Sequence, residues 1–294
     1  MNPGPSILGE LRSQYHQQLQ QAVWRYVNGK PTNADKDSDV SVRIASGMLE
    51  EAAEPGTALA GQTAGKNFTD ITLVFLQEAF SRLGHIRPGQ WEFSASQANI
   101  GIAAFYQYEH LAILQGFLNN LQKNDVDGSS KDLRAAFVKD YLITPDIVVS
   151  RGPLEDEAIN GHEEFILPGE KVAHHTPFRA ANNQTRILHA SVSCKWTIRS
   201  DRAQNSRTEA LNLIRNRKGH TPHIVVVTGE PLPTRLASIA LGTGDLDCVY
   251  HMALFELEAA INKSRDESQG EMLDTLVRGR RLRDISDLPF DLAL

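Results

Sequence analysis

The chain has 294 residues, of which 41% are hydrophobic and 22% are charged, and its formal net charge is −6. These values are ordinary for a globular protein that is long enough for one large domain or two small ones. They exclude a disulfide scaffold and a cysteine-rich zinc site, because there are only two cysteines. No apolar run approaches a membrane span, and the first residues lack the layout of a signal peptide. We therefore expect a soluble, cytoplasmic protein with no membrane partner.

In the first half of the chain, the pattern predicts mainly helices. Apolar residues at helical spacing indicate helices over 11–28, 68–83 and 97–122. Turn residues dominate 29–43, and the segment 56–67 is a glycine-rich loop.

In the second half, strands alternate with helical segments. We predict strands at 141–150, interrupted by Pro145, at 187–198 with alternating exposure, and at 223–230. A helix is predicted over 200–219, and 241–263 reads as a loop followed by a helix. Strands separated by helices predict an α/β fold with a mixed central β-sheet flanked by helices. Because no linker is convincing, we expect a single domain over 1–294.

A basic segment stands out in this acidic chain. Residues 179–218 hold nine lysines and arginines against only Asp201 and Glu209, which gives a local net charge of +7. A basic patch on an acidic protein favours a polyanion site. The alternative is a solvated helix face, but the charges lie among strand-like residues.

Three kinds of charged residue converge on the predicted strands. Asp146 follows Pro145 in one strand, while Ser193 and Lys195 share one face of another and Cys194 points to the opposite face. A lysine in an apolar strand needs acidic or phosphate partners, which Asp146 and Glu209 could supply.

Such a set suits phosphodiester hydrolysis. Carboxylates bind Mg²⁺ through oxygen, and the metal polarises a phosphodiester and lowers the pKa of a bound water. The lysine would offset charge in the transition state. The alternative is a structural cluster of ion pairs, which brings the same residue types together.

A third motif, Arg199-Ser200-Asp201-Arg202, follows the lysine strand directly. Arginine pairs with guanine O6 and N7, and aspartate accepts from cytosine N4, so this motif could read a GC-rich major groove. The alternative is phosphate clamping or a salt bridge within the helix.

Taken in order, the PD at 145–146, the SxK at 193–195, Glu209 and the RSDR at 199–202 resemble a known family. The pattern is similar to the PD-(D/E)xK restriction endonucleases of the CCGG-cutting group. The likeness is densest over ILHASVSCKWTIRSDRAQNSR (187–207), HIVVVTGEP (223–231), SIALGTGDLDCVYHMALFELE (238–258) and RLRDISDLPFDLAL (281–294). It also covers GQTAG (61–65), HIRPGQW (85–91) and ITPDIVVSR (143–151).

The resemblance implies a restriction-endonuclease-like core and a Mg²⁺-dependent type II restriction endonuclease. It implies that Asp146, Glu209 and the Cys194 carbonyl bind metal, and that Lys195 is the catalytic lysine. Glu209 is then the displaced acid of the motif, and Ser193 occupies the place where most of the wider superfamily has that acid.

The resemblance also implies how DNA is read. The inner CCGG is read by Arg199, Asp201 and Arg202. The outer G·C pair is read by Asp35 and Arg235 in the major groove, and Gln62 reaches the minor groove, while Asp37 stands at a further contact position. The implied site is GCCGGC, and the implied assembly is a homotetramer, two back-to-back dimers that cut two sites together.

One position departs from the family pattern. A glutamate is expected at the start of the helix after the glycine-rich loop, but the chain has Thr69 there, followed by Asp70. Either Asp70 takes the role of that acid or the carboxylate is absent. The rival hypotheses are a sequence-specific DNA-binding protein that has lost cleavage, and a structural phosphate-binding protein without base preference.

Overall fold

The structure is a computed structural model. It describes residues 4–49, 59–95, 101–113, 116, 120, 145–198, 200–242 and 244–294, apart from the side chains of 200–204. The described elements, in chain order, are α1 (Ile7–Ala22), β1 (Tyr26–Val27), β2 (Lys30–Pro31), α2 (Asp39–Met48), α3 (Gly61–Ser81), β3 (Trp91–Ala95), the 3₁₀ turns η1 (Ile102–Ala104) and η2 (Tyr106–Tyr108), β4 (Ile147–Arg151), α6 (Asp156–Asn160), β5 (Ile187–Lys195), α7 (Ser200–Asn216), β6 (His223–Thr228), α8 (Pro233–Ala240), β7 (Cys248–His251), α9 (Leu254–Ser264), α10 (Glu267–Arg278), β8 (Leu282–Asp284), η3 (Ile285–Asp287) and α11 (Leu288–Asp291).

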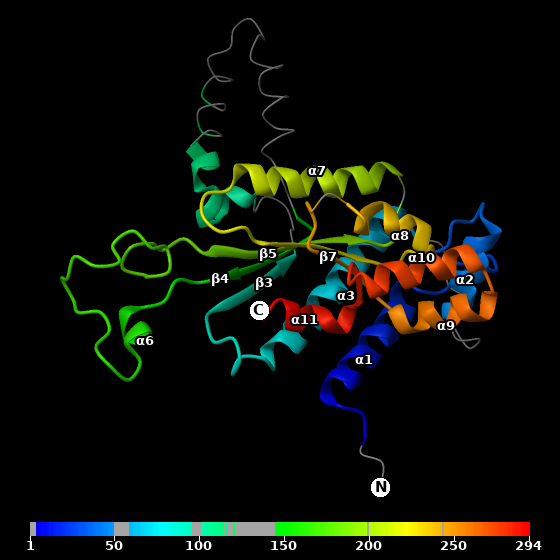
Figure 1. Cartoon of the computed structure of the whole chain (residues 1–294), viewed down its shortest axis with the longest axis horizontal. Helices are drawn as coiled ribbons and strands as arrows, with labels where there is room; N and C mark the ends of the chain where they lie inside the picture. Colours follow the sequence, from blue (N-terminus) through cyan, green and yellow to red (C-terminus); the bar gives the residue numbers. More distant parts are fainter. Residues whose placement is uncertain are drawn as a thin grey trace, which may run out of the picture. The chain divides into compact units, whose positions relative to one another are not determined.

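The strands form a mixed sheet in the order β3-β4-β5-β6-β7-β8. The pair β3–β4 is antiparallel, whereas β6–β7 and β7–β8 are parallel. Helices flank this sheet (Figure 1), so the predicted α/β class with a mixed central sheet is confirmed. Within the described residues, no helix is long and apolar enough to cross a membrane.

The chain divides into two compact units, which share strand β5 and helix α7. Unit 1 comprises 1–87, 192–210 and 223–294, and unit 2 comprises 88–191 and 211–222. In unit 1, α1 packs along α3, α2 along α9 and α8 along α10 (Figure 1). In unit 2, β3 and β4 pair over their whole lengths, from Trp91 with Arg151 to Ala95 with Ile147.

The first helix is shorter at its end than the predicted 11–28. It begins at Ile7, because the Ser6 side chain caps it by accepting the Gly9 N–H, and it ends at Ala22. A hairpin follows in which Asn28 and Gly29 take positive φ angles of 52° and 74°. An Asn-Gly pair favours such a two-residue turn, and this turn chemistry overrides the helical spacing.

The glycine-rich loop prediction is wrong from Gly61 onward, because α3 already begins there. The helix holds despite two glycines in its first turns, since its buried face continues through Phe68, Thr72 and Leu76. Tertiary packing of one face is what stabilises most helices.

The predicted helix over 97–122 is wrong in its first part. Residues 102–108 form two 3₁₀ turns with extended Phe105 between them. The buried Gln107 side chain donates to Leu188 O (2.7 Å) and accepts from Leu188 N–H (2.9 Å). These hydrogen bonds hold the segment against β5 in place of a continuous helix. Residues 96–100 and most of 114–122 lie outside the described residues.

The strand predictions need three corrections. Strand β4 starts after Pro145, consistent with the missing N–H donor of proline. Strand β5 ends at Lys195, and all seven of its central residues are buried. Its alternation is therefore absent, as expected for a strand covered on both faces. The segment predicted as a loop before the last helix contains the short buried strand β7.

Candidate functional site

The end of strand β5 carries the predicted lysine. Ser193 and Cys194 are buried, and Lys195 is half-buried as the last residue of the strand. The carbonyl of Lys195 accepts the Gly229 N–H from the segment that follows β6, at 3.4 Å. The strand end thus carries a charged side chain on a strand whose other described residues are mostly buried.

The segment that follows Lys195 is fixed on several sides. The indole Nε1 of Trp196 donates to Thr32 O at 3.2 Å, and its ring meets Phe68 edge-on with centroids 5.2 Å apart. A side chain at Gly229 would stand 3.2 Å from the Trp196 ring and 3.0 Å from the Met252 sulfur. Glycine at 229 therefore allows the close approach that locks Trp196 in place.

In the predicted recognition motif 199–202, residues 200–202 open helix α7. Arg199 and the side chains of Asp201 and Arg202 lie outside the described residues. Further along α7, Ser206 is buried and Glu209 is half-buried. The predicted acid is therefore held on a helix that begins five residues after Lys195, the predicted catalytic lysine.

Two predicted DNA contacts, 200 residues apart in the sequence, meet in unit 1. The Arg235 guanidinium, on helix α8, forms a hydrogen-bonded ion pair with Asp35. The Asp35 N–H donates to the buried Ser41 hydroxyl at 2.8 Å, and its carboxylate accepts the N–H of exposed Asp37 at 3.2 Å. Asp35 is thus held in a tight turn with its carboxylate turned to the arginine.

A third acid, Glu230, lies close to this pair. The sequence patterns do not predict it. Its side chain is 1% exposed. One carboxylate oxygen accepts the Ile198 N–H at 2.9 Å, and the other accepts the Leu232 N–H at 3.2 Å. The same carboxylate stands 4.0 Å from the Arg235 guanidinium. The one signal in the sequence is an acid at the end of a predicted core strand, between glycine and proline.

Burial governs the ionisation of Glu230. It raises the pKa of the Glu230 carboxyl to about 7, against the lowering effect of the Ile198 N–H and of Arg235. The nearby charge of Asp35 adds to the rise. A carboxyl with such a pKa changes its charge near neutral pH.

Helix α3 carries the position that departs from the family pattern. Gln62 is exposed in its first turn. The Thr69 hydroxyl donates to Gly65 O at 3.0 Å, and Asp70 forms an ion pair with Lys66 at 2.6 Å. Asp70 therefore has a cationic partner one turn away on its own helix.

Asp146 belongs to unit 2. It is half-buried at a bend directly before β4 and follows the buried Pro145. Strand β4 is antiparallel to β3 and buried in its first four residues. Asp146 therefore lies directly before a core strand, and not inside it as the predicted strand over 141–150 implies.

The predicted metal ligands supply oxygen donors. Asp146 and Glu209 are half-buried carboxylates, and Cys194 offers its carbonyl. Hard divalent cations prefer such ligands, so the donor chemistry fits. Among the described residues, no group of three or more histidine, cysteine, aspartate or glutamate side chains forms a metal cluster.

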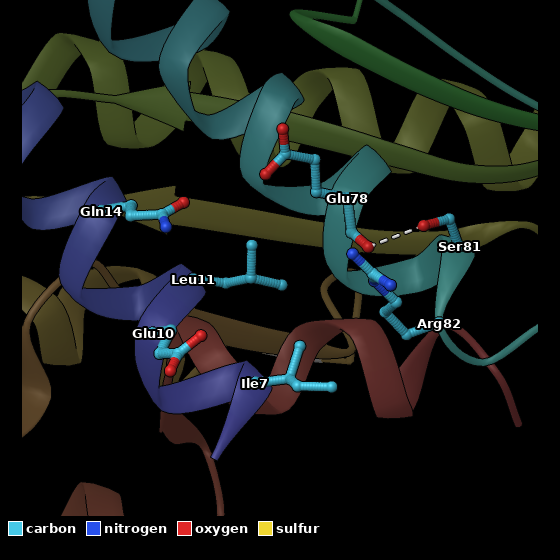
Figure 2. Close-up of a pocket in the computed structure, with 7 residues that line it drawn as sticks. All are labelled: Ile7, Glu10, Leu11, Gln14, Glu78, Ser81 and Arg82. Carbon is cyan, nitrogen blue, oxygen red and sulfur yellow. Dashed lines mark hydrogen bonds between the residues drawn. The ribbon is translucent and has the colours of Figure 1, made fainter. Parts of the chain in front are cut away.

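A pocket of about 300 Å³ lies between the first turns of α1 and the end of α3 (Figure 2). Its lining includes Glu10, Leu11, Glu78 and Arg82. The Ser81 hydroxyl, which also lines the pocket, donates to Glu78 O at 2.8 Å and so stabilises the end of helix α3. None of the predicted site residues lines this pocket.

Comparison with known proteins decides the family. The family model of the NgoMIV restriction enzyme matches residues 15–294. The chain belongs to the NgoMIV restriction enzyme family. It is also 44% identical, over 300 aligned positions and the full length of both chains, to the type II restriction enzyme NgoMIV of Neisseria gonorrhoeae.

Membership of the NgoMIV family confirms the predicted class. The chain is a type II restriction enzyme, a site-specific deoxyribonuclease, and its substrate is DNA. Type II restriction enzymes typically use a divalent metal, in keeping with the oxygen donors above. The rival hypotheses of a cleavage-deficient DNA-binding protein and of a phosphate-binding protein are set aside.

Proposed function

We propose that this enzyme recognises GCCGGC in double-stranded DNA and hydrolyses both strands with Mg²⁺. The observation that carries the outer base pair is the ion pair between Asp35 and Arg235. Arginine donates to guanine O6 and N7, while aspartate accepts from cytosine N4. The contact between this arginine and this aspartate supports their assignment to the two bases of one G·C pair.

The inner CCGG is assigned to Arg199, Asp201 and Arg202, which follow the segment fixed by Trp196. Each arginine that pairs bidentately with guanine should contribute about 1–3 kcal/mol of discrimination. Gln62, exposed at the start of α3, is assigned to the minor groove, and exposed Asp37 to a contact beside Asp35. These assignments rest on the resemblance.

The chemical step is assigned to the PD, SxK and Glu209 positions. Asp146, Glu209 and the Cys194 carbonyl would hold Mg²⁺, which when bound supplies Lewis-acid polarisation of the scissile phosphate and a more acidic water. The Lys195 ammonium orients the attacking oxygen and offsets the charge that develops on the phosphate. Ser193, on the same strand face, supports the lysine. Asp70 is assigned the role of the acid that is missing at Thr69.

The assembly is proposed to be a homotetramer of two back-to-back dimers. A palindromic site has a two-fold axis, so a closed dimer places one active centre on each strand. We also propose that the two compact units work as a single endonuclease domain. Its DNA substrate places the enzyme in the cytoplasm.

The test is digestion of a plasmid of known sequence with and without Mg²⁺, followed by sequencing of the ends. Cuts at GCCGGC alone, and only with the metal, support the proposal. Cuts at CCGG regardless of the outer pair would contradict the role of Asp35 and Arg235. Cuts at unrelated sequences would contradict the site as a whole.

A further inference from the structure

The buried carboxylate of Glu230 connects two segments of unit 1 that are distant in the sequence. The first is the stretch 196–198, which ends one residue before Arg199. The second is the start of helix α8, where Leu232 is the N-cap residue and Arg235 lies in the first turn. Each segment presents one backbone N–H to one oxygen of the carboxylate, at 2.9 Å and 3.2 Å.

Among the described residues, Glu230 supplies the side-chain acceptor for both N–H groups, while the next N–H of α8, that of Thr234, donates to Gln269 at 3.3 Å. The start of α8 has no side-chain cap, and the helix begins with Pro233, which brings no N–H of its own. Ile198 is buried, so its N–H would be costly to leave without an acceptor. A carboxylate satisfies both donors at once, whereas an amide in its place would turn an N–H₂ group toward one of them.

Neighbouring contacts hold Glu230 itself in place. Its N–H donates to the Thr228 hydroxyl at 3.2 Å, and its carbonyl accepts from the buried His251 ring at 3.2 Å. The carbonyl of the preceding Gly229 accepts from the side chain of buried Asn33 at 3.0 Å. Asn33 lies two residues before Asp35, so the turn that carries the outer-base aspartate is tied to the same point.

We propose that Glu230 is a positioning residue for specificity: its carboxylate joins the segment before Arg199 to the helix that carries Arg235, so that the inner and outer base pairs are read as one rigid unit. The inference rests on the proposed reading of GCCGGC. Glu230 touches no base in this role. It acts by fixing the distance between the two groups of side chains that do.

The physical consequence is a coupled loss of discrimination. Base reading depends on hydrogen-bond distance and angle, so a displaced side chain loses its contact with the base. Each bidentate contact that is lost removes discrimination of about 10- to 100-fold. Loss of Arg235 should weaken discrimination at the outer pair alone. Loss of the Glu230 link should weaken it at the outer and inner pairs together.

The experiment measures competition for binding in Ca²⁺, in place of Mg²⁺, with the full-length protein. The pH is held above the Glu230 pKa of about 7, so that the carboxylate is ionised. Three duplexes are compared: GCCGGC, ACCGGT with the outer pair changed, and GACGTC with an inner pair changed. The proteins are the wild type, Glu230→Gln and Arg235→Ala. We expect Glu230→Gln to lose about 10- to 100-fold of discrimination against both altered sites, and Arg235→Ala to lose it against ACCGGT alone.

Asp284→Asn is the matched control. Like Glu230, Asp284 lies in unit 1 and is 1% exposed. It too accepts two backbone N–H groups, from Leu254 and Ser286. These two hydrogen bonds involve neither the stretch 196–198 nor the start of helix α8. A merely structural effect lowers the fraction of active protein and leaves the ratios between duplexes unchanged, so this variant should keep wild-type discrimination.

Two results would overturn the inference. Wild-type discrimination in Glu230→Gln would remove the positioning role, and a loss confined to the outer pair would reduce Glu230 to a partner of Arg235. If Glu230→Gln does not fold, Glu230→Asp carries the test, because its shorter side chain keeps the charge but cannot reach both N–H groups. A wild-type protein without preference for GCCGGC would instead refute the proposed function, and the inference with it.

Discussion

The side chains assigned to chemistry and those assigned to reading should separate in experiment. On the proposed assignment, Asp146→Ala and Lys195→Ala remove metal binding and charge stabilisation but leave the proposed base contacts of Arg199 and Arg235 in place. We therefore expect both variants to lose cleavage in Mg²⁺ and to keep specific binding in Ca²⁺. A cleavage assay and a gel-shift assay on the same duplex measure the two effects. An Asp146→Ala protein that still cuts in Mg²⁺ would show that the catalytic assignment is wrong.

Glu230 should also make stability depend on pH. Its pKa is about 7 in the folded protein, above the ordinary value of 4.5. Between these values the folded protein holds a proton that the unfolded chain has released, so the free energy of unfolding falls as pH rises through this window. The Glu230→Gln variant lacks this titrating group, so it does not share this pH dependence. Its stability relative to wild type should therefore increase over the window, by up to about 3 kcal/mol.

Urea unfolding between about pH 5 and about pH 8 measures this difference. The charged and titratable neighbours are Asp35, Arg235 and His251. Burial lowers the pKa of His251 to about 4, so its charge is constant over the range. Asp284→Asn serves as the control, because the pKa of Asp284 is lowered and the group stays ionised. Parallel pH curves for Glu230→Gln and wild type would argue against the raised pKa.

At the scale of elements, variants of helix α3 test whether Asp70 takes the role of the glutamate that is absent at Thr69. Asp70 pairs with Lys66 on the exposed side of this helix. If Asp70 serves the metal site, Asp70→Ala should slow cleavage and raise the Mg²⁺ concentration required, whereas Lys66→Ala should not. If the acid matters only through its pair, both variants should lose the same small stability, about 0.2–0.5 kcal/mol. Titration of the cleavage rate with Mg²⁺ distinguishes the two cases.

At the scale of the whole molecule, the proposed tetramer predicts communication between DNA sites. Binding of a second site on the same plasmid is favoured by its high effective concentration. We expect a plasmid with two GCCGGC sites to be cut faster than a plasmid with one. A short cognate duplex added in trans should accelerate cutting of the single-site plasmid.

Analytical ultracentrifugation supplies an independent measurement of assembly. The tetramer predicts about four chains per particle without DNA, as closed symmetry allows. A dimer in the centrifuge, together with equal rates on the two plasmids, would leave a simple dimeric endonuclease.

The sequence by itself determined the fold class, the family and several elements. Runs such as Ile224–Val227 predict buried strands because β-branched residues suit a covered sheet. The predicted helix over 200–219 begins where α7 begins but runs three residues past its end at Asn216, before Gly219 with φ of 72°. The order of Asp146, Ser193, Lys195 and Glu209 along the chain pointed to the restriction endonucleases before any geometry was known.

Only the tertiary structure decided which residues meet across long distances in the chain. Where a continuous helix was predicted, the structure has 3₁₀ turns, and the hydrogen bonds between the Gln107 side chain and Leu188 stabilise them. The pair of Asp35 and Arg235, and the buried Glu230 beside it, likewise have no local pattern that announces them. Periodicity and turn chemistry act over a few residues, whereas these contacts depend on packing that brings separate segments together. The hydrogen-bond donors to the Glu230 carboxylate are backbone N–H groups. Every non-proline residue carries such a group, so no sequence pattern marks these partners.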